Sequence, residues 1–144
     1  WERFPATRAH AHGHVDQPTL RRLVSAAPVT LCLVRRANRD GHVMRSFEVP
    51  AMGGCMLTED TAEHRELFGD DGASVVYFQD PATLADRLHW LLHNPAERQR
   101  LAQSARQRIS AGLHTYAERV AQMLRQSGVL PRATAAAMPT PVQR

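Results

Sequence analysis

The sequence predicts an α/β fold in which a parallel sheet carries helices on both of its faces. Short apolar runs rich in β-branched residues, typical of buried strands, occur at 29–34, 55–58 and 74–78. Segments in which apolar residues recur at helical spacing separate these runs. An alternation of strands and helices builds a parallel sheet that helices cover on both sides.

The first half of the chain is expected to hold a helix on each side of the first strand. The first helix, over 19–27, ends at Pro28, which cannot continue a helix. The second, over 43–52, follows a polar loop and ends at Gly53-Gly54. Glycine readily adopts the left-handed conformation that commonly follows a helix, so this pair predicts a C-terminal cap.

Capping residues predict where the helices of the second half begin. The Thr61 hydroxyl can accept a hydrogen bond from the free amide of residue 63 or 64. Asp80-Pro81 combines an N-cap residue with proline at the first helical position. Two further helices are expected over 96–111 and 115–127, and the last forms a helical C-terminal extension.

Length and composition limit the class of protein. With 144 residues, 43% hydrophobic and 22% charged, the chain has the size and composition of one globular domain, and its apolar runs are too short to span a bilayer. The net charge of +4 arises from 18 arginines, with no lysine, a bias that suggests a GC-rich bacterial genome. Cys32 and Cys55 lie in apolar runs and are expected to be free, buried thiols in a reducing, cytoplasmic compartment.

The expected domain organisation has three parts. Residues 1–16 read as an irregular lead-in segment, 17–128 as the α/β domain, and 129–144, rich in alanine and proline, as a disordered tail. The sequence starts at Trp1 without a leader pattern, and we interpret it as a fragment of a longer protein.

Two polar loops are candidates for a ligand site, because ligands of parallel sheets bind beyond the carboxyl ends of the strands. These loops are 35–45 and 59–66. Arg45 at the start of the second helix, together with free backbone amides, would suit a phosphate. Glu48, one turn further, can accept hydrogen bonds from two adjacent hydroxyls, as a ribose presents them. Gly53 and Gly54 would allow a ligand to approach closely. Alternatively, Glu48 is a solvated helix residue and the two glycines form only a turn.

A longer stretch resembles a known family. Residues 44–59 read MRSFEVPAMGGCMLTE, and they are followed by ELF at 66–68 and by VYF at 76–78 before Asp80-Pro81. This pattern is similar to the C-terminal domain of group 1 glycosyltransferases, in particular the spore-maturation CgeB-like branch. The resemblance covers roughly residues 19–124, and its most specific part is Arg-x-Phe-Glu-x-x-Ala-x-Gly-Gly.

The resemblance implies a GT-B architecture, in which two Rossmann-like domains bind a nucleoside-diphosphate sugar mainly through the C-terminal one. It implies hexosyl transfer with retention of configuration, no metal, and no cofactor besides the donor substrate. The acceptor is unknown, and the N-terminal GT-B domain is expected to be missing. Relatives use a Glu-x7-Glu pair at the donor; Glu48 matches the second member, and Asp40 stands in place of the first.

Further site residues follow from the same resemblance. It assigns Thr58, Glu59 and Thr61 to the lining of the diphosphate or sugar pocket, and Glu66 to the acidic position after the next strand. The basic pair that retaining relatives use to neutralise the leaving diphosphate has no clear counterpart. Arg39 and Arg45 are our candidates for that role. Because the acceptor-binding domain is expected to be missing, the isolated chain should bind nucleotide without catalysing transfer.

Two other features of the sequence suggest different functions. His10, His12 and His14 alternate as metal ligands sometimes do, but an extended histidine-rich linker explains them equally well. Arginines between 98 and 108 would suit a non-catalytic Rossmann-like module that binds nucleic acid or a protein partner. Because they are spread around a helix that also carries apolar residues, a solvated helix face is the favoured interpretation, and nucleic acid is not the expected partner.

Overall fold

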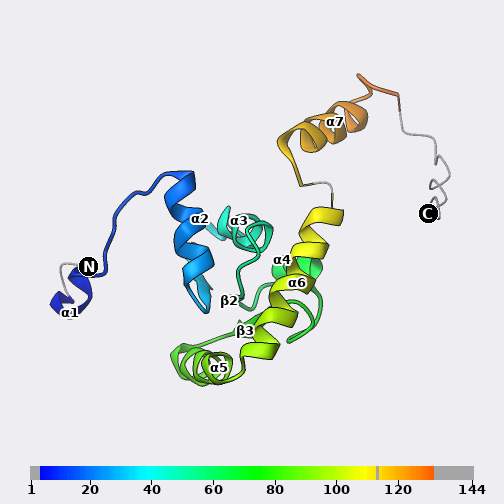
Figure 1. Cartoon of the computed structure of the whole chain (residues 1–144). Coiled ribbons are helices and arrows are strands. Elements are labelled where there is room, and N and C mark those ends of the chain that lie inside the picture. The colour runs from blue at the N-terminus through cyan, green and yellow to red at the C-terminus, as the bar shows by residue number, and fades with distance from the viewer. Residues whose placement is uncertain (1–3, 113, 132–144) are drawn as a thin grey trace, which may run out of the picture. The chain divides into compact units, whose positions relative to one another are not determined.

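The computed structural model describes residues 4–112 and 114–131. The chain forms two compact units, Trp1–Ala111 and Gly112–Arg144 (Figure 1). The first unit contains, in order, α1 Pro5–Arg8, α2 Gln17–Ala26, β1 Thr30–Cys32, a 3-10 turn Arg36–Asn38, α3 Arg45–Ala51, β2 Met56–Glu59, α4 Ala62–Phe68, β3 Val76–Phe78, α5 Pro81–His93 and α6 Pro95–Ala111. This alternation confirms the predicted α/β class.

The three strands form one parallel sheet in the order β1-β2-β3. Thr30 pairs with Met56 across β1 and β2, and Leu57 pairs with Val76 across β2 and β3. All four residues of β2 are buried, as expected for the central strand of a sheet covered on both faces.

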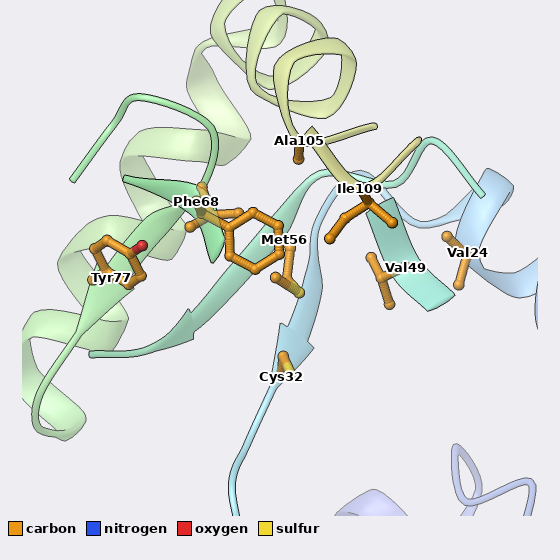
Figure 2. Close-up of a cluster of buried hydrophobic side chains, with 9 residues drawn as sticks. Val24, Cys32, Val49, Met56, Phe68, Tyr77, Ala105 and Ile109 are labelled. Atoms are coloured by element: carbon orange, nitrogen blue, oxygen red, sulfur yellow. The ribbon is translucent and has the colours of Figure 1, made fainter. Parts of the chain in front are cut away.

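The two faces of the sheet pack against different helices. Because side chains alternate along a strand, Met56 enters one hydrophobic cluster and its neighbour Leu57 enters the other. Figure 2 shows the first cluster, in which side chains from α2, α3, α4 and α6 meet the sheet. The second cluster joins the opposite face to α5 and the beginning of α6. The predicted cover of helices on both faces is therefore confirmed.

Local chemistry sets the ends of α3 and α2. Gly53 follows α3 with φ of 81°, and the amides of Gly53 and Gly54 donate to the carbonyls of Pro50 and Val49 at 2.9 and 3.0 Å. These two bonds form the Schellman cap that the glycine pair predicts. Helix α2 begins at Gln17, two residues before the expected start, because the Asp16 carboxylate caps it by accepting from the Thr19 amide at 2.9 Å.

Gly54 also determines how closely α2 and α3 approach. A Cβ at this position would lie 2.6 Å from Val24 Cγ1 on α2 and 2.9 Å from Val49 Cγ1 on α3. Both valines belong to the first hydrophobic cluster. The glycine is therefore needed for this contact, independently of any ligand.

The segments that precede α2 and follow α6 are described only in part. The predicted lead-in segment contains the single turn α1. In the second unit, helix α7 spans Tyr116–Gln126 and begins with a capping box between Thr115 and Glu118. The predicted tail at 129–144 lies outside the described residues from 132 onwards. No helix in the described ranges is both long and apolar enough to cross a membrane.

Candidate functional site

A groove of about 1270 Å³ lies between α2 and α3, which are neighbours in Figure 1. We call it the α2–α3 groove. Its polar lining residues are Gln17, Arg21, Arg22 and Ser25 from α2 and Glu48 from α3. Two guanidinium groups and one carboxylate thus share a single open groove.

Glu48 is held from two sides in this groove. Gln17 Nε2 donates to Glu48 Oε1 at 3.1 Å, and the Arg45 guanidinium forms an ion pair with Oε2. The Glu48 side chain keeps 18% of its surface exposed, whereas Arg45 keeps 46%. The carboxylate is therefore oriented by its neighbours and still accessible to a ligand.

The start of α3 does not offer the phosphate seat that the sequence suggested. The amides of Ser46 and Phe47 donate to the carbonyls of Val43 and Met44 at 2.9 and 3.0 Å. These amides are already engaged in the first turn, and α3 has only seven residues. The positive charge near Glu48 comes instead from the side chains of Arg45 and of the α2 arginines.

A second, smaller cavity of about 320 Å³ lies between the two polar loops at the carboxyl end of the sheet. We call it the carboxyl-edge cavity. Its polar side chains are Arg39, Asp40, Glu59, Asp60, Thr61 and Glu63. With four carboxylates and one arginine among its lining residues, it repels a phosphate but can accept hydrogen bonds from hydroxyl groups.

The elements around the carboxyl-edge cavity hold its side chains in place. Glu59, at the end of β2, is 7% exposed, and its Oε2 accepts from the Val34 amide at 2.6 Å. The Thr61 hydroxyl donates to the Gly41 carbonyl at 2.6 Å while it accepts from the His64 amide at 3.1 Å. The latter bond is the helix cap predicted from the sequence. Thr61 thus joins the two loops.

Asp60 of this cavity is paired with an arginine. Arg65 donates to its two oxygens at 2.6 and 2.7 Å. This hydrogen bonding lowers the pKa of Asp60 below its ordinary value of 3.8. Asp60 is therefore ionised at neutral pH and paired with Arg65 of α4.

The structure separates the site residues predicted from the sequence into three places. Glu48 lines the α2–α3 groove and Arg45 is its ion-pair partner, whereas Arg39, Asp40, Glu59 and Thr61 line the carboxyl-edge cavity. The remaining four line neither: Thr58, Glu66, Gly53 and Gly54.

The position of each of these four residues explains why it does not line a cavity. Thr58 is fully buried, and its hydroxyl donates to the Cys32 carbonyl at 3.3 Å, so it is not part of a cavity wall. Glu66 is exposed on α4. Gly53 and Gly54 cap the C-terminal end of α3, which precedes β2 and so lies away from the carboxyl ends of the strands.

A buried histidine, His64, links α3 to the end of β2, and no pattern in the sequence points to this role. His64 Nδ1 lies 2.8 Å from the Glu59 carbonyl, which can only accept, so Nδ1 carries the proton. Nε2 then accepts from the Ser46 hydroxyl at 2.8 Å, and Ser46 Oγ accepts from the Val43 amide at 3.1 Å. This chain of bonds connects α3, β2 and α4.

The Ser46–His64 pair resembles a nucleophile with its base, but its burial excludes that role. Both residues have 0% exposed surface, so no substrate reaches the Ser46 hydroxyl. Desolvation lowers the pKa of His64 below its ordinary value of 6.5. The histidine is therefore neutral and structural. A polar residue within a short helix gave no sign in the sequence that it would be buried.

The predicted buried thiols are confirmed. Cys32 and Cys55 are free and buried. Burial raises the pKa of the Cys55 thiol to about 11 and raises that of Cys32 as well. Both thiols are therefore protonated and poor nucleophiles. Among the described residues, no group of three or more His, Cys, Asp or Glu side chains is placed to hold a metal ion.

The arginines at the start of α6 contact the unit's own backbone. Arg98 donates to the carbonyls of Leu91 and Leu92 at 2.6 and 2.8 Å. Arg100 donates to the Gly72 carbonyl at 2.8 Å and pairs with Glu97. These contacts tie α6 to the end of α5 and to the turn before β3, so the two arginines have structural partners.

The fold and its cavities define an α/β domain with an open groove, whose partly apolar lining carries two arginines and one glutamate. A family model described as glycosyl transferase-like matches residues 1–125. Since the match covers most of the chain, the protein belongs to this glycosyl transferase-like family. No significant match was found among curated proteins or among solved structures.

Proposed function

We propose that this chain is the donor-binding domain of a GT-B glycosyltransferase of the CgeB-like branch, and that the α2–α3 groove binds the nucleoside diphosphate of a sugar donor. The observation that carries the proposal is the oriented, accessible carboxylate of Glu48 in the same groove as Arg21 and Arg22. Membership of the glycosyl transferase-like family supports the reaction class.

Each side chain of the groove has a chemical role in this proposal. The two oxygens of Glu48 accept hydrogen bonds from the vicinal hydroxyls of the ribose. The guanidinium groups of Arg21 and Arg22 neutralise the diphosphate, on which negative charge accumulates as the glycosyl bond breaks. Fixed charges of this kind stabilise the leaving group without reorganising during the reaction.

The carboxyl-edge cavity is our candidate for contacts with the transferred sugar. A sugar carries several hydroxyl donors and no phosphate charge, so it suits the carboxylates of Asp40 and Glu59 better than a diphosphate does. Arg39 and Thr61 line the same cavity and belong to the proposed sugar site. Retaining hexosyl transfer in the cytoplasm, to an acceptor bound by an N-terminal domain, remains part of the proposal, and the chain alone is expected to bind the donor without turnover.

Binding of nucleic acid or a protein partner through the arginine-rich helices is the alternative function. The contacts of Arg98 and Arg100 with backbone carbonyls favour a structural role for these two residues instead. Salt dependence separates the two functions, because nucleic-acid affinity falls steeply with ionic strength.

Calorimetric titration of the full chain with ADP, GDP, CDP and UDP tests the proposal. At least one diphosphate is expected to bind saturably, and Glu48→Gln is expected to weaken it by about 1.5–3 kcal/mol, the strength of a hydrogen bond to a charged group. Asp86→Asn, which removes an exposed carboxylate from α5, is the matched control and should leave the affinity unchanged. Equal affinity of the Glu48→Gln variant and the unmodified chain would refute the assignment of Glu48.

A further inference from the structure

We infer that Gln17 is a positioning residue that orients the Glu48 carboxylate toward the ribose, and that the α2–α3 groove thereby selects ribonucleotides over 2′-deoxyribonucleotides. This inference rests on the proposed function of the groove. It adds a residue on a different helix, 31 positions earlier in the chain, to the residues that determine donor specificity.

The contacts of the carboxylate carry the inference. Gln17 Nε2 occupies one acceptor position of Oε1, and Arg45 occupies one of Oε2. A carboxylate offers about four acceptor positions, so each Glu48 oxygen keeps one for a ligand hydroxyl. The last torsion of a glutamate side chain is broad, and a partner on each oxygen fixes the plane of the group. Without Gln17 this plane is free to turn about the remaining contact with Arg45.

Gln17 is itself held in a defined position. It is the first residue of α2, and the Asp16 carboxylate caps that helix by accepting from the Thr19 amide. Further along, α2 packs on α3 through Val24, which lies against Val49 and the glycine cap. The amide of Gln17 therefore meets Glu48 from a fixed helix end, which is what a positioning residue requires.

A purely structural bond between two helices is the competing explanation, and ribose selectivity distinguishes the two. If Gln17 acts through Glu48, its loss should reduce the advantage of a 2′-hydroxyl. If it only joins α2 to α3, its loss should weaken ribo- and deoxyribonucleotides equally.

The experiment measures the affinity of the full chain for the tightest-binding of the four diphosphates and for its 2′-deoxy analogue. The unmodified chain is expected to prefer the ribonucleotide. Gln17→Ala should reduce this preference by about 3- to 10-fold, the range for loss of one hydrogen bond. Gln17→Met, which keeps the length of the side chain but removes the hydrogen-bond donor, should reduce the ribose preference as Gln17→Ala does. Gln103→Ala on the exposed side of α6 is the matched control and should keep the full preference.

A double-mutant cycle completes the test. In a Glu48→Gln background, Gln17→Ala should change the ribose preference no further, because the group that Gln17 orients is already altered. The inference is overturned if the unmodified chain shows no ribose preference, or if Gln17→Ala and Gln17→Met retain it while Glu48→Gln loses it. If Glu48→Gln leaves diphosphate binding unchanged, the proposed function itself fails.

Discussion

Replacing His64 with glutamine should destabilise the first unit and change how its stability depends on pH. The imidazole is fully buried and bonded at both nitrogens, to the Glu59 carbonyl and to Ser46, each at 2.8 Å. The side-chain amide of glutamine can replace Nε2 of the imidazole but not Nδ1, which is closer to the backbone. The Glu59 carbonyl therefore loses its donor. Loss of the buried bond should lower the free energy of unfolding by about 1–3 kcal/mol at neutral pH.

The pH dependence follows from the lowered pKa of His64. In the unfolded chain His64 takes up a proton near its ordinary pKa of 6.5, whereas desolvation delays protonation of the folded state to lower pH. Between these two pKa values the unfolded state binds more protons, so stability falls as the pH decreases. The slope is at most about 1.4 kcal/mol per pH unit. Above the unfolded pKa this group adds no pH dependence.

Urea unfolding followed by circular dichroism, between about pH 5 and pH 7.5, measures both effects. The control is His12→Gln, which removes an exposed histidine from the segment before α2. The pKa of Asp60 is lowered from 3.8, so the stability that this carboxylate provides is lost only at more acidic pH. Stability curves of His64→Gln and of the unmodified chain that run parallel through this pH range would refute the buried, neutral state of His64.

Two further substitutions test the packing of the first unit. Gly54→Ala should lower stability by about 1–3 kcal/mol through overpacking, since its Cβ would lie 2.6 Å from Val24 Cγ1, and an unchanged melting temperature would contradict this contact. Leu57→Ala should cost about 2–5 kcal/mol, because Leu57 is fully buried in the central strand. Leu33→Ala, at a side chain 57% exposed, should stay within about 0.5 kcal/mol, and equal losses at the two leucines would contradict their assigned burial.

Helix ends were predictable from the sequence because the groups that determine them are neighbours in the chain. Thr61 accepts from the His64 amide, Asp80 accepts from the Thr83 amide at 2.8 Å, and Gly53 has the positive φ of a cap. Each interaction spans only a few residues. The cap at Asp16 makes α2 begin two residues before the start that apolar spacing predicts.

The candidate site was predictable only in part. The motif around Glu48 identified a carboxylate that the structure places in a groove. The sequence did not identify the groove's other wall, since Gln17 and Arg21 belong to the helix that precedes the first strand, about 30 residues before Glu48 in the chain. The resemblance assigned Thr58 to the pocket lining, but its side chain is buried beside His64 of α4.

The sequence alone determined the alternation of strands and helices, the parallel sheet with two covered faces, and the caps, because apolar periodicity and capping depend on residues close together in the chain. Only the tertiary structure decided which polar side chains share a cavity. The approach of α2 to α3, set by Gly54 and its valine neighbours, brings Gln17 to Glu48, and the burial of His64 joins α3 to α4. Contacts of this kind depend on how whole elements pack, which no local pattern encodes.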